Sequence, residues 1–170
     1  MTDPHLVGRD KDTPQEQRPS PAVLLTVCVS ASPIFVFNRE LGDGACVRNG
    51  GMTFDHFIDQ LGKLGFVGPW HFAPNVVNAR PGEQFLVVNH GGETHTFTEV
   101  DEFGGGISDR LNAIMHLDTV APECQALDDD DFVAPGQTYR EDIEEAGDEK
   151  YQCCIHPWMR LTAHVSEKPH

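Results

Sequence analysis

Apolar residues recur in short runs from residue 70 onward, and the pattern predicts β-strands. Residues 84–89 form a continuous apolar run typical of a central strand, and residues 94–100 and 161–165 alternate between polar and apolar side chains. Further expected strands lie at 23–29, 70–78 and 131–134, with a hairpin formed by 138–143 and 150–154. Glycine and proline separate these runs, and no β-α-β alternation is visible. The pattern predicts a mainly β protein, an antiparallel sandwich.

One segment, from Thr53 to Leu64, has helical rather than strand periodicity. Its apolar residues recur three or four positions apart and form a single stripe: Phe54, Phe57, Ile58, Leu61 and Leu64. Thr53 suits the N-cap, and Gly65 suits the position just after the helix. We interpret the stripe as a surface that packs against the sandwich.

The 170 residues predict one domain with flanking and inserted segments. Residues 1–20 are polar and carry three prolines, which indicates a disordered lead, and residues 21–170 are assigned to the single domain. Residues 101–130 form an irregular insertion with a glycine-rich turn at 104–106, a possible short helix within 107–117, and an acidic run at 128–131. The acidic run lacks the spaced oxygen ligands of a calcium loop, so we interpret it as a solvated loop.

The charge of the chain excludes one class of partner. There are 27 acidic against 12 basic residues, a formal net charge of −15. Nucleic acids are recognised through a basic surface, so a nucleic-acid partner is not expected. No apolar run reaches the 18 residues needed to span a membrane.

Two short motifs carry the chemistry. Cys153, His156 and Met159 are spaced Cys-x2-His-x2-Met, and Asn89 precedes His95 in an Asn-x5-His pattern. Two imidazoles, a thiolate and a weak thioether are the ligands of a mononuclear copper electron-transfer site. In both motifs the chain resembles the cupredoxins, the family of blue copper proteins, and the short loop is similar to that of their plastocyanin- and amicyanin-like bacterial members.

The resemblance implies a Greek-key cupredoxin sandwich and one type 1 copper ion bound by His95, Cys153, His156 and Met159. It also implies that Asn89 bridges the two ligand loops by hydrogen bonds near the cysteine. The expected function is single-electron transfer rather than enzymatic catalysis. The partner would be a redox protein, which could dock near His156 and Trp158. The expected location is periplasmic or extracellular, although no clear signal peptide is present.

The five cysteines leave the disulfide pattern open. If Cys153 binds a metal, four cysteines remain and can pair in three ways. Neighbouring residues on an extended strand point to opposite faces, so we do not expect Cys153 and Cys154 to bond to each other. Cys154 could pair with Cys124 or with Cys46, and we favour Cys124. Cys28 completes the set.

Other interpretations of the same residues predict different properties. A copper carrier or buffer would bind the metal and hand it on without electron transfer. A metal-free structural module would have Cys153 in a disulfide. His90 could line the site, and Glu93 could offer an oxygen ligand that perturbs it.

Overall fold

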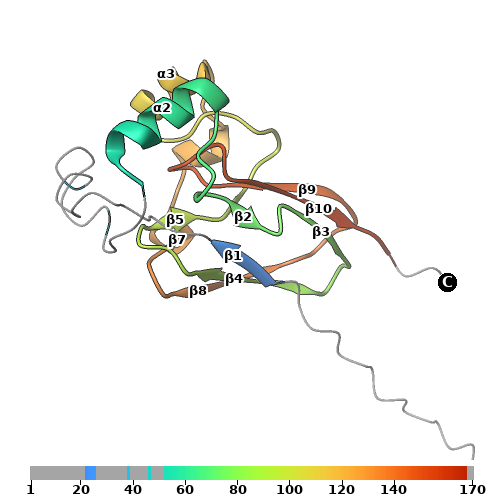
Figure 1. The fold of residues 1–170 in the computed structure, drawn as a ribbon. Coiled ribbons are helices and arrows are strands. Elements are labelled where there is room, and N and C mark those ends of the chain that lie inside the picture. The colour runs from blue at the N-terminus through green and yellow to red at the C-terminus, as the bar shows by residue number, and fades with distance from the viewer. Residues whose placement is uncertain (1–21, 26–37, 39–45, 47–51, 168–170) are drawn as a thin grey trace, which may run out of the picture.

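The computed structural model describes residues 22–25, 38, 46 and 52–167, and these fold into two facing four-stranded sheets (Figure 1). The strand order in the first sheet is β2-β1-β4-β8, with bounds Phe72–Ala73, Ala22–Leu25, Gln84–Asn89 and Thr138–Asp142. The order in the second is β3-β10-β9-β6, with bounds Val76–Ala79, Arg160–Val165, Gly147–Gln152 and Thr98–Glu99. A small third sheet pairs β5, His95–Thr96, with β7, Phe132–Val133.

The predicted mainly β class is confirmed, and the sheets are mixed rather than fully antiparallel. β1 runs parallel to β4, and β10 runs parallel to β3, whereas the other named pairs are antiparallel. The expected strand at 23–29 begins as predicted, and its positions 26–29 lie outside the described residues, as do the predicted disordered lead and Cys28.

The expected hairpin of residues 138–143 and 150–154 is wrong. β8 pairs with β4 in the first sheet, whereas β9 pairs with β10 and β6 in the second. Ile143, which follows β8, is buried and exchanges backbone hydrogen bonds with the turn before β4: its N–H donates to the Glu83 carbonyl, and its carbonyl accepts from Gly82. The chain is therefore held to the first sheet to the end of β8 and crosses to the second only afterwards.

The expected strand at 94–100 is divided by Phe97 into β5 and β6. β5 pairs with β7, and β6 pairs with β9, so the two halves belong to different sheets. Phe97 is 2% exposed and lies in the core between them.

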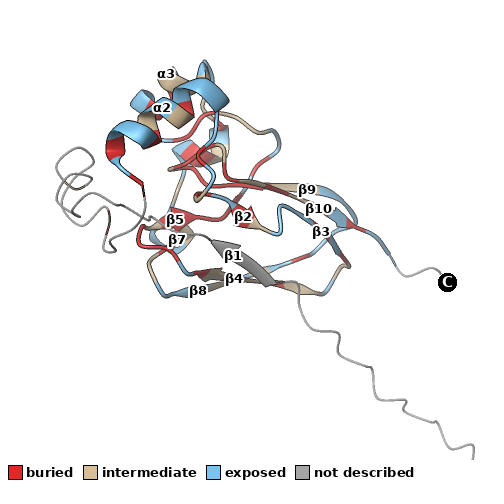
Figure 2. Cartoon of the chain, viewed as in Figure 1, coloured by how far each residue is buried: buried red, intermediate tan, exposed pale blue. Residues whose placement is uncertain are grey.

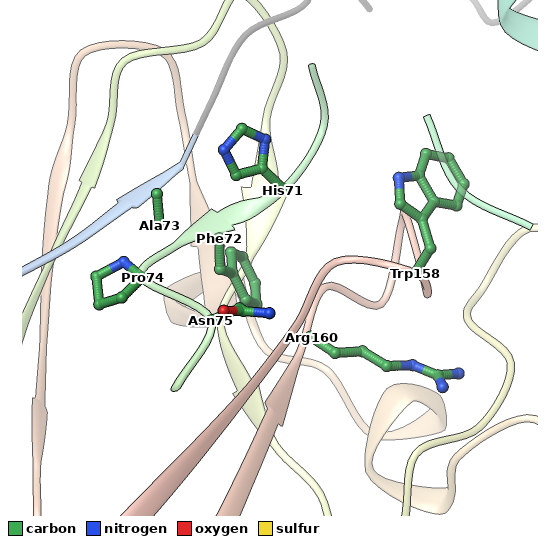
Figure 3. A pocket seen from close by; sticks show the side chains of 7 residues that line it. All are labelled: His71, Phe72, Ala73, Pro74, Asn75, Trp158 and Arg160. Carbon is green, nitrogen blue, oxygen red and sulfur yellow. The ribbon is translucent and has the colours of Figure 1, made fainter. Parts of the chain in front are cut away.

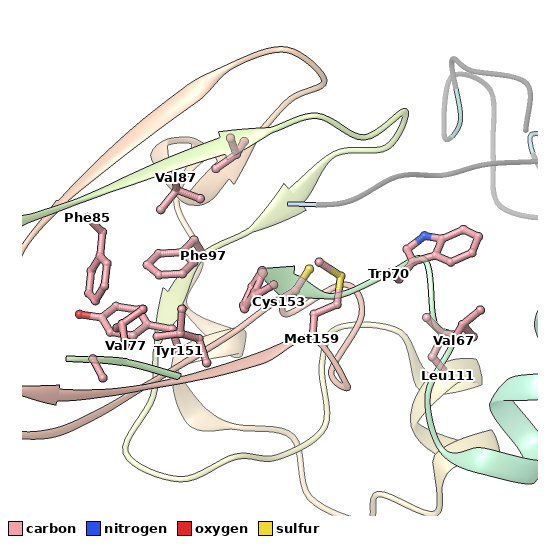
Figure 4. Packing of buried hydrophobic residues seen from close by; sticks show 14 of the residues in the cluster. Val67, Trp70, Val77, Phe85, Val87, Phe97, Leu111, Tyr151, Cys153 and Met159 are labelled. Carbon is pink, nitrogen blue, oxygen red and sulfur yellow. The ribbon is translucent and has the colours of Figure 1, made fainter. Parts of the chain in front are cut away.

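An aromatic cluster joins the two sheets. Phe85 of β4 meets Tyr151 of β9 at 5.1 Å between ring centroids, and Phe97 stacks on Tyr151 at 4.5 Å (Figure 4). Burial in Figure 2 follows the alternation of the strands, as in β4, where buried and intermediate residues alternate. Fully burying one such side chain contributes about 1.5–3 kcal/mol, so this cluster is a main source of stability between the sheets.

Helix α2, Phe54–Leu64, confirms the predicted helix and its caps. The Thr53 side chain accepts a hydrogen bond from the His56 N–H, and Gly65 adopts a left-handed conformation with φ 73°. The predicted stripe is buried at Phe54, Phe57 and Leu61, but Leu64 is 57% exposed because the helix ends there and its last turn leaves the core.

The short helix expected within 107–117 is confirmed as α3, Asp109–Met115. Two 3-10 turns that the sequence did not indicate follow it, η1 (Pro122–Gln125) and η2 (Asp129–Asp131). The glycine-rich turn is tightly packed: a Cβ on Gly106 would lie 1.9 Å from the Cys154 carbonyl oxygen. In the part of the chain that the structure describes, no helix is long and apolar enough to cross a membrane.

Candidate metal centre

The structure brings three of the predicted ligands together from two distant segments. His95 lies on β5, while Cys153 and His156 lie in the loop between β9 and β10. The Cys153 Sγ atom is 3.7 Å from Nδ1 of His95 and 3.8 Å from Nδ1 of His156. All three residues are buried, and their ligand atoms lie within 4.8 Å of one another.

These separations suit donors that share one metal ion. With a metal–sulfur bond of about 2.3 Å and a metal–nitrogen bond of about 2.0 Å, a sulfur and a nitrogen on the same metal lie about 3.5–3.7 Å apart. Both sulfur–nitrogen distances are close to this range, so the three residues would be able to hold one metal ion. A His2Cys donor set with a weak axial thioether is typical of blue copper sites.

The Cys153 sulfur is held by the backbone around it. Two N–H groups, those of Thr96 and His156, each approach Sγ at 3.4 Å. The Thr96 side chain also accepts a hydrogen bond from the Cys154 N–H at 2.7 Å, which ties β5 to the ligand loop. Hydrogen bonds to the sulfur tune the redox potential of such a site, and these contacts also fix the direction of the thiol.

Met159 closes the ligand loop. The Cys153 N–H donates to the Met159 carbonyl at 3.0 Å, and the Met159 N–H donates to the His156 carbonyl at 2.8 Å. Met159 is fully buried in the same hydrophobic cluster as Cys153. Figure 4 shows both sulfur-bearing side chains pointing toward the same part of the core. An axial role for Met159 stays a prediction.

The charges in the cluster favour a thiolate. Burial alone would raise the pKa of Cys153, but the hydrogen bonds with His156 and His95 and the charges of both rings together lower this pKa well below its usual value. Burial likewise acts to lower the pKa of His156, but contacts with Cys153 and Glu93 raise it to about 9. The thiolate is the form that binds metal, so this lowered pKa would favour coordination.

Asn89 lies at the end of β4 and organises the segment that leads to His95. Its Nδ2 donates to the carbonyls of Glu93 and Val133, each at 2.7 Å, and its Oδ1 accepts from the Gly91 N–H at 2.7 Å. These bonds join the loop before β5 to β7, the strand that pairs with β5. The bridge to the cysteine loop that the resemblance implies stays a prediction.

The carboxylate of Glu93, a candidate oxygen ligand, contacts His156 and Trp70. Oε2 lies 3.1 Å from His156 Nε2 and accepts from the indole N–H of Trp70 at 2.8 Å. Glu93 is 4% exposed, and Oε1 has no hydrogen-bond partner among the described residues. Burial acts to raise the pKa of Glu93, but the hydrogen bonds with His156 and Trp70 and the charges of His156 and His95 together outweigh burial, and the pKa is lowered. Sequence reasoning missed this contact, because nothing in the spacing indicates which side of His156 Glu93 faces.

Two further candidates are not among the clustered donors, and one of them contacts a donor ring. His90 is exposed and is not among the clustered donors. Trp158 is partly buried, and its ring lies 5.2 Å from the His156 ring in an edge-to-face arrangement. Trp158 also lines a pocket of about 340 Å3 with His71, Phe72, Ala73, Pro74, Asn75 and Arg160 (Figure 3).

Cys154 is bonded to Cys124, as favoured from the sequence. The two Cα atoms are 5.4 Å apart, and the bond closes a separation of 30 residues. Cys153 is a free thiol, which is the opposite of what a metal-free module with a Cys153 disulfide requires. Cys46 also takes part in a disulfide.

Comparison with known proteins gives similarities in structure only. No family model matches the chain, and no curated protein matches it. Among solved structures, it is similar to a purple cupredoxin from Nitrosopumilus maritimus, with 14% identity over 86% of this chain and 99% of the other and a TM-score of 0.47.

Two smaller structures are also similar. Amicyanin from Paracoccus versutus shares 21% identity, covering 59% of this chain and 76% of its own, with a TM-score of 0.38. Oxidised plastocyanin from Dryopteris crassirhizoma shares 17% identity, covering 58% of this chain and 91% of its own, with a TM-score of 0.38. These values are too low to bear on function, which has to be argued from the residues of the site.

Proposed function

We propose that this protein binds one copper ion through His95, Cys153, His156 and Met159 and carries single electrons as a type 1 copper protein. The observation that carries the proposal is the convergence of one free buried thiol and two imidazole Nδ1 atoms at 3.7 and 3.8 Å. Copper supplies a one-electron Cu(I)/Cu(II) couple when it is bound.

The chain contributes rigidity and exclusion of water. His95 and Cys153 are 0% exposed and His156 is 4% exposed, so the donors do not depend on solvent for their positions. A trigonal set with a weak axial ligand suits both copper oxidation states moderately well, so little has to move when an electron arrives or leaves. Burial of the donors also supports a carrier of electrons over an enzyme, because a substrate has no direct access to them.

We assign the docking surface for a redox partner to the area around Trp158. His156 is almost fully buried. Trp158 contacts the His156 ring and also lines the pocket described above. An electron passing through Trp158 would therefore avoid crossing the sandwich. The proposed partner is a redox protein.

The disulfide supports an oxidising compartment. Disulfides persist outside the cytosol in most organisms, and the Cys124–Cys154 bond is buried within the protein. We propose a periplasmic or extracellular location on this basis.

The first experiment is a visible absorption spectrum of the reduced apoprotein after addition of one equivalent of Cu(II). An intense thiolate-to-copper band that bleaches with ascorbate and returns on oxidation is the expected result. Copper that binds without this band would contradict electron transfer and favour the copper carrier. Failure to bind copper would reject both functions.

A further inference from the structure

His95 and His156 have different environments at their outer nitrogens. His95 Nε2 is buried and has no hydrogen-bond partner among the described residues, whereas His156 Nε2 lies 3.1 Å from the Glu93 carboxylate. The contact is buried on both sides, since each side chain is 5% exposed. Burial of a carboxylate this deeply is unfavourable in free energy unless the carboxylate is paired, and the contact with His156 supplies a partner.

Glu93 is held in place from a second direction. The same oxygen, Oε2, accepts the indole N–H of Trp70, and the Trp70 ring packs on Phe57 of α2 at 4.9 Å between centroids. Phe57 also approaches Trp158 at 5.9 Å, and the Trp158 indole N–H donates to the Trp70 carbonyl at 3.0 Å. Phe57 of helix α2 thus packs against both tryptophans, one of which binds Glu93 while the other contacts the His156 ring.

The donor and acceptor roles follow from this arrangement. An ionised carboxylate only accepts hydrogen bonds, and Oε2 already accepts one from Trp70. In a neutral imidazole the nitrogen that faces the carboxylate must therefore carry the proton, which leaves the lone pair on Nδ1. Nδ1 is the atom that faces Cys153 Sγ at 3.8 Å.

We propose that Glu93 is a positioning residue that fixes the tautomer and ring orientation of His156 and makes it a stronger donor to the metal. This inference rests on the proposed copper site and deepens it. A carboxylate on the far nitrogen of a ligating histidine raises the basicity of that ligand. A more basic ligand stabilises Cu(II) over Cu(I), so Glu93 lowers the reduction potential. The outer nitrogen of His95 has no such partner among the described residues, so no carboxylate raises the basicity of His95 in this way.

Two substitutions at this position separate the hydrogen bond from the charge. Glu93→Gln can place its carbonyl oxygen at the Oε2 position and keep both hydrogen bonds without the charge. Glu93→Leu removes both. We expect Cu(II) affinity to fall about 10–100-fold in Glu93→Leu and less in Glu93→Gln, with the reduction potential raised in the same order. A tenfold loss that affects only Cu(II) corresponds to about 59 mV. Glu149→Gln, a partly buried carboxylate of β9 that binds Tyr151 instead, is the matched control, and we expect it to leave both quantities unchanged.

A second readout does not depend on electron transfer. In the diamagnetic Cu(I) form, the His156 Nε2–H should appear in a nitrogen-correlated NMR spectrum as a slowly exchanging proton in the unmodified protein and in Glu93→Gln, but exchange quickly in Glu93→Leu. The same spectrum of the Zn(II) form tests the contact even if the protein gives no copper band, since zinc accepts the same donors.

Fast exchange in the unmodified protein, or a Cu(II) affinity in Glu93→Leu within twofold of the original, would overturn the inference. Thermal unfolding of the metal-free variants shows whether each retains the fold. If Glu93→Leu does not fold, the comparison of the unmodified protein with Glu93→Gln still decides: a fast-exchanging Nε2–H in either one contradicts the role assigned to Glu93.

Discussion

Cys153 and Cys154 are adjacent in sequence, yet they serve two different regions of the molecule. Cys153 belongs to the main hydrophobic core and points to two imidazoles. Cys154 belongs to a smaller cluster with Val100, Ala121 and Cys124, and there it forms a disulfide. Successive side chains of an extended chain point to opposite faces, so one step in sequence separates the proposed metal ligand from a covalent crosslink.

The two regions differ in the contacts that hold them together. In the first, donors are held apart at distances that suit a metal. In the second, a covalent bond and close backbone contacts fasten the insertion to the β9–β10 loop. Changes in the first region should therefore alter colour and redox potential, and changes in the second should alter stability.

The largest effect is expected from Cys153→Ser. A hydroxyl does not supply the thiolate that gives the charge-transfer band, so the visible band should disappear completely. The metal-free protein should keep its fold, because serine is slightly smaller and Cys153 makes no disulfide. Visible absorption after Cu(II) addition measures the first property, and thermal unfolding of the apoprotein measures the second. A band that persists would remove Cys153 from the ligand set.

The next effect is expected from the double substitution Cys124→Ala and Cys154→Ala. Opening a crosslink over a separation of 30 residues should cost about 3–4 kcal/mol in free energy of unfolding. Urea unfolding of the apoprotein, compared with the unmodified chain under non-reducing conditions, gives this value. The copper band should remain at the same wavelength. A lost or shifted band would show that the two regions are not independent.

A smaller loss of stability is expected from Gly106→Ala. The added Cβ would lie 1.9 Å from the Cys154 carbonyl oxygen, which the Ile107 N–H also contacts at 2.7 Å. The backbone must shift to accommodate it, and overpacking of this kind costs about 1–3 kcal/mol. Gly68→Ala is the matched control, since a Cβ there meets nothing within 4 Å. Equal stability of the two variants in urea would contradict the close approach.

The smallest change in stability is expected from Met159→Leu. The two side chains have similar volumes, so the free energy of unfolding should change by less than about 1.5 kcal/mol. Copper should still bind, and the reduction potential should rise because an apolar side chain favours Cu(I) over Cu(II). Cyclic voltammetry measures the potential. An unchanged potential together with an unchanged spectrum would mean that Met159 is not the axial ligand.

The sequence predicted local features better than long-range ones. Helix α2 and both of its caps follow from the spacing of Phe54, Phe57 and Leu61 and from Thr53 and Gly65, because capping and periodicity are local properties. The hairpin of β8 and β9 was wrong, since two consecutive strands can belong to different sheets without any local signal. The division of residues 94–100 at Phe97 was missed for the same reason.

At the site, the motifs predicted the donors that the fold brings together, but not what surrounds them. The spacing of Cys153 and His156 is local, and the resemblance supplied His95. The contact of Glu93 with His156 and Trp70 depends on three segments meeting in space, and only the structure reveals it.

Cys153 is the one free thiol among the residues that the structure describes, and none of its surface is exposed. A thiol reagent can reach Cys153 only when the surrounding structure opens locally. The rate at which the apoprotein is alkylated therefore reports how often this opening occurs. The proposed metal ligand is for that reason also a natural probe of the kinetics of opening. It can report how often the interior of the sandwich becomes accessible, with no label introduced and no other side chain changed.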